Sequence, residues 1–202
     1  AIRSVCNSVD AILVEDCCHA FHWGQTNPSL GVHGDFVFYS IHKYLAAGSG
    51  GLLHATSRDY PASMEPEGES IDPGVLDLLA RADLQAIAYK RRENLERALQ
   101  GLANIEGLHP LRTNVPLVPQ SLPVWVDGEK MREKLYFHLM ERGVPTTALY
   151  YRLHQSLENK QFPQSFEVSE HILNLPIHQD MTAGKVDLML LKIQSALKEL
   201  RA

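Results

Sequence analysis

The sequence has few of the features that mark membrane or nucleic-acid-binding proteins. No apolar stretch among its 202 residues approaches the roughly 20 residues that a bilayer-spanning helix needs. The formal net charge is -5 and no basic run occurs, so charge supports neither a nucleic-acid partner nor an anionic membrane surface. With 45% hydrophobic and 21% charged residues, the composition is that of an ordinary soluble globular protein.

Cysteine is scarce and unevenly placed. There are three cysteines, Cys6, Cys17 and Cys18, and an odd number with two adjacent members does not suggest a disulfide framework. The first residues, AIRSVCNSVD, lack the charged-then-apolar order of a secretory signal. A reducing, cytoplasmic location is therefore predicted.

Three short apolar runs precede residue 57. Residues 11–14 (AILV), which end at Glu15-Asp16, predict a strand buried on both faces, as in a parallel sheet. Residues 35–40 (DFVFYS) predict a second strand, and residues 51–55 predict a third after a Gly-rich turn. Such strands indicate the end of an open α/β sheet, in which ligands bind outside the carboxyl ends of the strands.

The composition changes after this sheet. Residues 57–74 contain three prolines, two glycines and several acids, which predicts a solvated linker. Residues 75–102 have apolar positions at helical spacing and predict one long helix that bridges two domains. Beyond them an α+β pattern is expected. It consists of a strand at 122–126, a helix at 128–142 ended by Gly143, a strand or strand-like turn at 144–151 and another at 171–178, and a last helix with Thr182 as its N-cap.

The stretch LVEDCCHAFHWG (13–24) concentrates possible metal ligands and nucleophiles. The residue types that bind zinc are present here, as Cys17, Cys18, His19 and His22. A structural zinc site, however, usually takes two pairs of ligands from separate segments, and the chain has no second cysteine pair. A nucleophilic cysteine needs a lowered pKa, whereas a free cysteine beside a buried strand behaves as a small hydrophobe. Packing roles for both cysteines and no metal site are predicted.

Lys43 offers a different chemistry. It stands three residues after Ser40, at the end of the second predicted strand, while Asp16 ends the first. A lysine can form a Schiff base with the aldehyde of pyridoxal phosphate (PLP). An aspartate can keep the pyridine nitrogen protonated, and a hydroxyl can hold the phosphate. These residue types at adjacent strand ends predict a PLP site.

Several ordered motifs resemble those of the DegT/StrS-type sugar-nucleotide aminotransferases, which are fold-type-I PLP enzymes. Together they cover most of the chain. The motifs are VEDCCHA (14–20), which is similar to the family's EDAAQA or EDAAHA, GVHGDF (31–36), KYLAAGSGG (43–51), RGVPTTALYYRLH (142–154) and LPIHQDMT (175–182).

The resemblance implies an α/β fold in three segments. Residues 1–57 would form the carboxyl-terminal part of the PLP-binding large domain, at the end of a mostly parallel sheet. Residues 58–105 would be a linker and bridging helix, and residues 106–202 a small α+β domain. The family's amino-terminal half of the large domain has no counterpart, and the chain does not begin with Met. Part of a longer protein is therefore expected.

The resemblance also implies roles for individual residues. Lys43 would be the Schiff-base lysine and would move the proton during transamination, Asp16 would pair with the pyridine nitrogen, His19 would lie beside the cofactor ring, and Ser40 would bind the phosphate. The implied reaction moves an amino group from an amino-acid donor, glutamate, to a keto-sugar nucleotide. A homodimer is expected, because fold-type-I sites usually borrow residues from a partner subunit.

Two alternatives stay open at this point. Fold-type-I scaffolds also host lyases and desulfurases, which would keep the cofactor and change the reaction. The chain would otherwise be a truncated, non-catalytic relative that folds and dimerises without cofactor.

Overall fold

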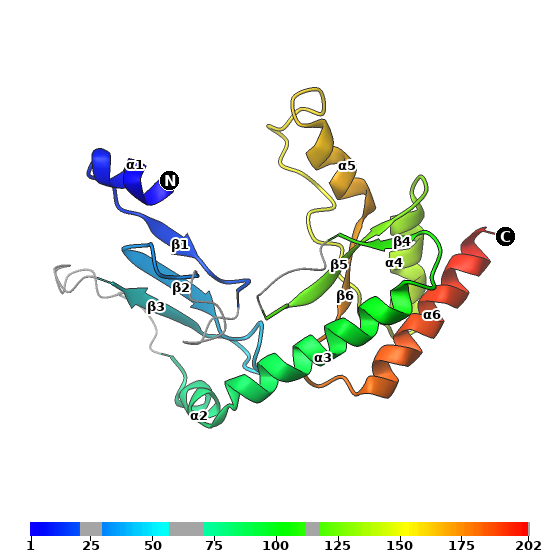
Figure 1. The fold of residues 1–202 in the computed structure, drawn as a ribbon, viewed down its shortest axis with the longest axis horizontal. Helices are drawn as coiled ribbons and strands as arrows, with labels where there is room; N and C mark the ends of the chain where they lie inside the picture. The colour runs from blue at the N-terminus through cyan, green and yellow to red at the C-terminus, as the bar shows by residue number, and fades with distance from the viewer. Residues whose placement is uncertain (21–29, 57–70, 112–117, 202) are drawn as a thin grey trace. The chain divides into compact units, whose positions relative to one another are not determined.

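The computed structural model describes residues 1–20, 30–56, 71–111 and 118–201. Its contacts divide the chain into two compact units, Ala1–Ile87 with Pro116–Gln120, and Ala88–Val115 with Ser121–Ala202. Figure 1 shows the elements of both. None of the helices in the described ranges combines the length and the apolar character needed to span a membrane. His22 and most of the predicted linker, residues 57–70, lie outside the described residues.

The first unit contains a three-stranded sheet. A short helix, α1 (Ile2–Ser8), precedes strands β1 (Val14–Asp16), β2 (Phe36–Ser40) and β3 (Gly51–Ala55), which lie in the order β1-β2-β3. β1 pairs with β2 in parallel, and β2 pairs with β3 in antiparallel fashion. The parallel pair brings the carboxyl ends of β1 and β2 to one edge of the sheet, which is where the sequence places Asp16 and Ser40.

The first strand is shorter and more exposed than predicted. β1 begins only at Val14, and the side chains of Ile12 and Val14 are 55% and 52% exposed. Burial on both faces was therefore the wrong expectation for this strand within the described residues. Val37, on the neighbouring strand β2, is fully buried, so the sheet is covered at its middle strand.

The predicted bridging helix is two helices. α2 (Pro73–Arg81) starts at Asp72, whose side chain accepts a hydrogen bond from the amide of Gly74, and it ends at Ala82 in extended backbone. α3 (Leu84–Leu102) starts anew because Asp83 accepts a hydrogen bond from the amide of Ala86, as an N-cap residue does. The division between the two units falls inside α3.

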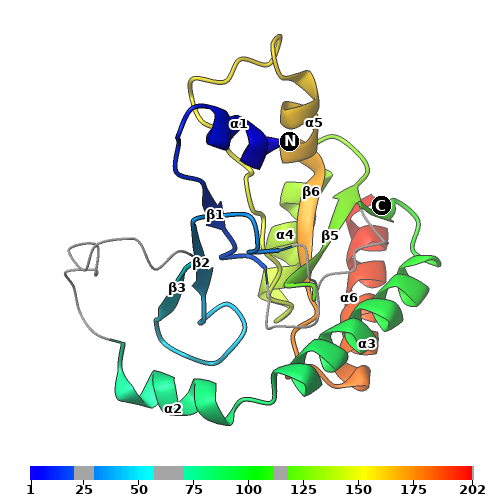
Figure 2. The ribbon, with the colours of Figure 1, turned by 60° about the vertical axis from the view of Figure 1, so that its left-hand side comes forward.

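The second unit is built on an antiparallel sheet. Strands β4 (Leu108–Pro110), β5 (Ser121–Val126) and β6 (Ile172–Pro176) lie in the order β4-β5-β6. Helices α4 (Met131–Glu141) and α6 (Ala183–Arg201) pack side by side (Figure 2), and α5 (Pro163–His171) leads into β6. This α+β arrangement agrees with the predicted pattern, although β4 and α5 were not individually expected.

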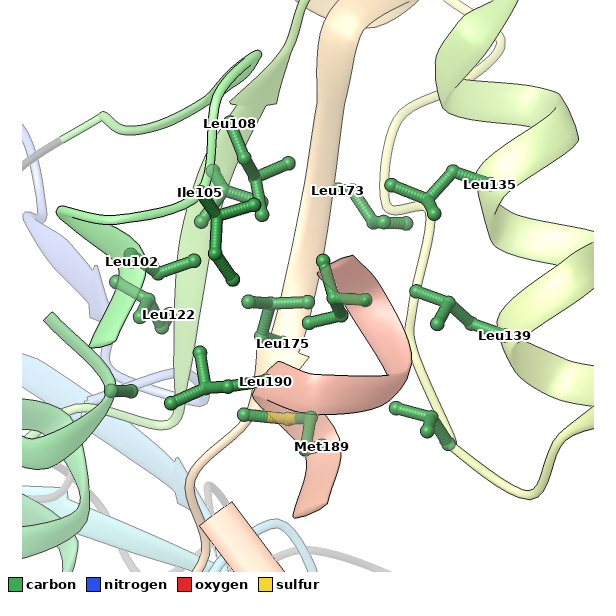
Figure 3. Packing of buried hydrophobic residues seen from close by; sticks show 14 of the residues in the cluster. Leu102, Ile105, Leu108, Leu122, Leu135, Leu139, Leu173, Leu175, Met189 and Leu190 are labelled. Atoms are coloured by element: carbon green, nitrogen blue, oxygen red, sulfur yellow. The ribbon is translucent and has the colours of Figure 1, made fainter. Parts of the chain in front are cut away.

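One apolar core holds this unit together (Figure 3). Alternate residues of β5 are buried, as expected for a strand with one face on the core. The core has contributions from α3, α4, β5, β6 and α6, including Leu102, Leu122, Val124, Leu135, Leu139, Leu173, Leu175, Ile193 and Leu197.

The ends of α4 and α6 agree with the sequence. The amide of Lys185 donates to the hydroxyl of Thr182 at 3.3 Å, which confirms Thr182 as the N-cap of α6. After α4, Gly143 adopts a left-handed φ of 71°, and the amide of Val144 donates to the carbonyl of Leu139. That conformation explains why a glycine ends this helix.

Candidate active site

The candidate site lies in the first unit, where β1 and β2 end. Asp16 is the last residue of β1 and Ser40 the last of β2. Lys43 follows in a tight turn, in which the amides of Tyr44 and Leu45 both donate to the carbonyl of Ile41. The turn is held in place by apolar packing, since Ile41 and Leu45 belong to a small core with Val75 of α2. Lys43 is thereby held on a fixed piece of backbone.

Asp16 is held as a carboxylate. Its Oδ1 accepts a hydrogen bond from the amide of Cys18 at 2.9 Å. Hydrogen bonds from the backbone and side chain of Cys18 lower the pKa of the Asp16 carboxyl, and the nearby Lys43 and His19 lower it further. The side chain is exposed and ionised at neutral pH, so it can face a cationic group of a ligand.

Lys43 and His19 are in direct contact. The Nζ atom of Lys43 lies 2.8 Å from Nε2 of His19, and Nδ1 of the same imidazole lies 2.6 Å from Oε1 of Gln120. The hydroxyl of Tyr44, a residue only 4% exposed, donates to the carbonyl of His19 at 2.7 Å. The backbone and both ring nitrogens of His19 are thus fixed from three directions.

Ser40 has a different neighbour. Its hydroxyl lies 3.1 Å from Nδ1 of His42. Ser40 also lines a pocket of about 20 Å³ together with Tyr39, Tyr44 and Leu79. The structure therefore brings Asp16, His19 and Lys43 together and pairs Ser40 with His42.

The two adjacent cysteines behave as packing residues. Cys17 is 5% exposed, and its amide donates to the carbonyl of Phe38 on β2. Desolvation raises the pKa of both the Cys17 and Cys18 thiols, which opposes formation of a thiolate nucleophile. In the ranges that the structure describes, no three His, Cys, Asp or Glu side chains converge as metal ligands.

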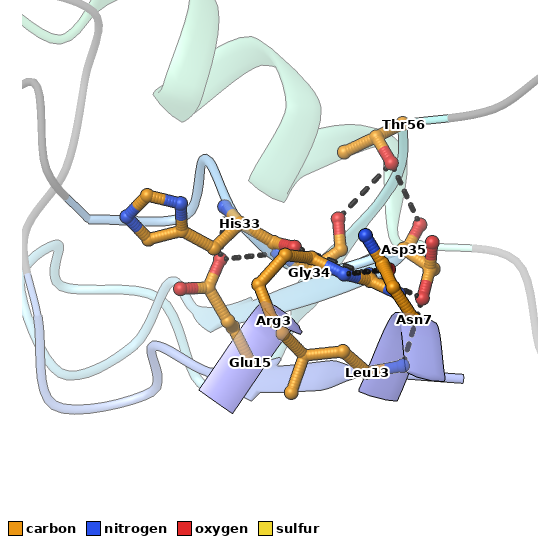
Figure 4. A network of polar contacts seen from close by, with 8 residues as sticks. All are labelled: Arg3, Asn7, Leu13, Glu15, His33, Gly34, Asp35 and Thr56. Atoms are coloured by element: carbon orange, nitrogen blue, oxygen red, sulfur yellow. Dashed lines mark hydrogen bonds and ion pairs between the residues drawn. The ribbon is translucent and has the colours of Figure 1, made fainter. Parts of the chain in front are cut away.

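The segment GVHGD (31–35) owes its composition to local structure (Figure 4). The Glu15 carboxylate accepts hydrogen bonds from the amides of His33 and Gly34. The Asp35 carboxylate accepts from Arg3 and from the amide of Leu13, at 2.7 and 2.8 Å. These contacts fasten the loop to β1, so Glu15 and Asp35 hold the strand that carries Asp16.

Glycine is required twice in this loop. Gly31 has a left-handed φ of 67°, and a Cβ there would collide with the Tyr39 hydroxyl. At Gly34 a Cβ would lie 2.6 Å from the carbonyl oxygen of Phe36. Both glycines therefore serve the close approach of the loop to the sheet.

Three further residues at the site have no recognisable signal in the sequence. His42 was given no role, although it lies beside Ser40. Tyr44 adjoins Lys43 in the sequence, but nothing in the pattern indicates that its hydroxyl holds His19. Gln120 is 101 residues from His19, and no local pattern reveals a contact of that range.

The fold and the family model together identify the class of protein. The fold, a sheet with a parallel strand pair followed by an α+β unit, matches part of the fold-type-I aminotransferase fold. The chain belongs to the DegT/DnrJ/EryC1/StrS aminotransferase family, whose sequence model matches residues 78–194. The matched range follows Asp16, His19, Ser40 and Lys43 in the sequence.

Solved structures extend the likeness to the first unit. The aminotransferase TlmJ from Streptoalloteichus hindustanus superposes with a TM-score of 0.74 at 24% identity, over 100% of this chain and 62% of that one. A DegT DnrJ EryC1 StrS aminotransferase from Brucella abortus gives 0.71 at 15% identity, over 96% and 59%. The protein Spr1654 from Streptococcus pneumoniae, in its PLP form, gives 0.67 at 17%, over 94% and 58%.

At these identities the superpositions establish the fold. The chain spans 62%, 59% and 58% of the lengths of these three proteins. The family is one of aminotransferases, and the similar solved structures include the PLP form of Spr1654.

Proposed function

We propose that this chain is part of a PLP-dependent aminotransferase that moves an amino group from glutamate to a keto-sugar nucleotide. The observation that carries the proposal is the convergence of Asp16, His19 and Lys43 at the carboxyl ends of β1 and β2, with Lys43 Nζ 2.8 Å from His19 Nε2. Membership of the aminotransferase family supports the reaction class.

The donor set fits the cofactor. The Asp16 carboxylate, with its lowered pKa, suits a protonated pyridine nitrogen because an opposite charge favours the protonated form. The Lys43 amine suits the aldehyde, and the Ser40 hydroxyl with the His42 imidazole offers hydrogen bonds to the phosphate. When bound, PLP supplies the aldehyde and an electron sink for the substrate's reacting carbon.

The chain's own residues would then act on protons. Lys43 is half-buried and sits on an anchored turn, so its amine can deliver and recover a proton at the carbon from which the amino group leaves or to which it is added. His19 lies within hydrogen-bond reach of that amine and orients it. Asp16 stays ionised throughout, because the Cys18 amide donates to it whatever happens at Lys43.

A homodimer in the cytoplasm is part of the proposal. The pocket that Ser40 lines measures about 20 Å³, whereas pockets for cofactor-sized ligands hold about 300–1,000 Å³. Further walls, from the rest of a longer protein or from a second subunit, are needed to enclose PLP. The free thiols of Cys6, Cys17 and Cys18 agree with a reducing compartment.

Product analysis tests the reaction. The protein is incubated with PLP, glutamate and a panel of keto-sugar nucleotides, and we expect 2-oxoglutarate and an aminated sugar nucleotide in equal amounts. Lys43→Ala should abolish both, while Lys185→Ala, which removes a lysine of α6, should leave both unchanged. Release of an eliminated product or sulfide instead would identify a lyase or a desulfurase. A folded dimer that neither binds PLP nor forms product would be a non-catalytic relative.

A further inference from the structure

The two hydrogen bonds of the His19 ring determine where its proton resides. A lysine ammonium carries only donors, so Lys43 must donate to Nε2 of His19 across their 2.8 Å contact. Nε2 is then the acceptor nitrogen, and the proton of the neutral ring sits on Nδ1. Nδ1 in turn needs an acceptor, and Oε1 of Gln120 lies 2.6 Å away.

We propose that Gln120 is a positioning residue that fixes His19 as its Nδ1–H tautomer, so that the Nε2 lone pair receives a proton from Lys43. In this step one N–H bond of the Lys43 ammonium breaks and its electron pair stays on Nζ. The proton forms a new bond to Nε2, which leaves a neutral amine and an imidazolium. The amine is the form that attacks a carbonyl carbon.

The geometry accommodates the transferred proton. Once His19 is an imidazolium, both of its ring nitrogens are donors, and Gln120 Oε1 still accepts from Nδ1 while the Lys43 amine accepts from Nε2. The Tyr44 hydroxyl holds the His19 carbonyl, so the ring keeps its place while the proton moves. The tautomer of a histidine depends on what each ring nitrogen binds, and Gln120 supplies the acceptor that Nδ1–H needs.

The role of the Gln120–His19–Lys43 contacts in catalysis rests on the function proposed above, because Lys43 must be a neutral amine to react with the aldehyde of PLP. The arrangement itself is testable without PLP. Failure of PLP to bind would count against the proposed function and leave the tautomer and the reactivity of Lys43 measurable.

The first test is the His19 tautomer in the cofactor-free chain, read from ring nitrogen chemical shifts in long-range proton–nitrogen correlation spectra. We expect Nδ1–H in the parent and in Gln120→Glu, whose carboxylate keeps the acceptor. Gln120→Leu removes the acceptor at Nδ1 and leaves only the Lys43 contact to favour Nδ1–H, so the share of the Nε2–H form should rise. A ring that is mostly Nε2–H in the parent, or an Nε2–H share that does not rise in Gln120→Leu, would overturn the proposal.

The second test is the reactivity of Lys43 toward formaldehyde with cyanoborohydride, measured by mass spectrometry relative to Lys185 in the same sample. Because base catalysis is lost, Gln120→Leu should lower the Lys43 to Lys185 ratio by about 100-fold, and Gln120→Glu should restore it. Lys185 lies on α6 in the second unit and corrects for differences in reagent and protein concentration. An unchanged ratio in Gln120→Leu, or an equal loss in Gln120→Glu, would contradict the proposal.

A double-mutant cycle shows whether Gln120 acts through His19. His19→Ala should lower the ratio as much as Gln120→Leu does, and adding Gln120→Leu to His19→Ala should lower it no further. Additive losses would mean that Gln120 affects Lys43 by another route, and the positioning role would then be wrong.

Discussion

The Nζ atom of Lys43 lies 2.8 Å from Nε2 of His19, although 24 residues separate them in the sequence. The contact exists because β1 and β2 pair in parallel, so that the chain segments leaving both strands emerge at the same edge of the sheet. In an open α/β sheet that edge is where ligands bind.

Asp16→Asn should reduce transamination by about 100-fold, because a neutral amide cannot favour a protonated pyridine nitrogen as a carboxylate does. The asparagine oxygen can still accept from the Cys18 amide, so the local backbone should be retained. The measurement is the rate of 2-oxoglutarate formation. Asp10→Asn is the matched control, since Asp10 has a left-handed φ of 52°, which asparagine tolerates. Equal rates for Asp16→Asn and Asp10→Asn would remove Asp16 from the site.

Gly34→Ala should destabilise the loop beside β1 by about 1–3 kcal/mol, because the added methyl has no space to occupy. Its Cβ would lie 2.6 Å from the Phe36 carbonyl oxygen and 3.1 Å from Cγ of Glu15. Hydrogen exchange of residues 31–40 measures the effect locally. At Gly48 a Cβ meets nothing within 4 Å, so Gly48→Ala should exchange like the parent. Unaltered protection in Gly34→Ala would show that the loop is not packed as described.

Leu175→Ala should lower the free energy of unfolding of the second unit by about 2–5 kcal/mol, through lost burial and a residual cavity. Leu175 is fully buried in β6, whereas Leu191 on α6 is 63% exposed. Leu191→Ala should therefore change stability by less than about 0.5 kcal/mol. Urea unfolding followed by Trp125 fluorescence, in a Trp23→Phe background, reports on this unit. A similar decrease in the free energy of unfolding for the two variants would show that Leu175 is not part of the buried core.

Glu199→Gln should weaken the acid dependence of stability. The Arg142 guanidinium and the Ser195 hydroxyl hydrogen-bond to the Glu199 carboxylate and lower its pKa from 4.5 to about 2. Because the pKa is depressed by folding, the stabilisation is complete above pH 4.5 and is lost as the pH falls toward 2.

The measurement is the free energy of unfolding between neutral pH and the acid limit. The parent should lose more stability on acidification than Glu199→Gln, and the variant should be less stable than the parent at neutral pH. Glu106→Gln, in an exposed turn, should follow the parent. Identical acid profiles for the parent and Glu199→Gln would show that the Arg142 contact does not persist in solution.

Much of the second unit could be predicted from the sequence because its signals are local. The spacing of Val186, Leu190, Ile193 and Leu197 predicts one buried face of α6, and all four residues are in the core. A hydroxyl at an N-cap and a left-handed glycine at a helix end are also properties of single residues. Thr182 and Gly143 therefore mark their helix ends correctly.

Two predictions from the sequence were wrong: one long helix at residues 75–102, and a strand buried on both faces at residues 11–14. Residues 75–102 were predicted to form one helix because a break at Ala82 leaves the apolar spacing almost intact. The signal for the start of a second helix is the Asp83 side chain, which accepts a hydrogen bond from the amide of Ala86. Residues 11–14 read as a buried strand because apolarity does not tell whether a covering layer is present, and Ile12 and Val14 are exposed here.

In the candidate site, too, some residues could be predicted from the sequence and others could not. Asp16, Ser40 and Lys43 could be placed at neighbouring strand ends from the strand pattern alone, since each directly ends or follows a predicted strand. The contact between His19 and Gln120 spans 101 residues and depends on how a distant segment returns to the sheet. That contact therefore follows from the tertiary structure and has no local signal in the sequence, and the same holds for the pairing of Ser40 with His42.

The central claim is that Lys43 is the lysine that holds PLP, and borohydride reduction tests it most directly. The protein is mixed with PLP at substoichiometric concentration and reduced, and the modified lysine is identified by mass spectrometry. The account predicts modification concentrated at Lys43 and abolished by Lys43→Ala, with Lys185 unmodified. Modification spread over exposed lysines, with Lys43 no more labelled than Lys185, would contradict it.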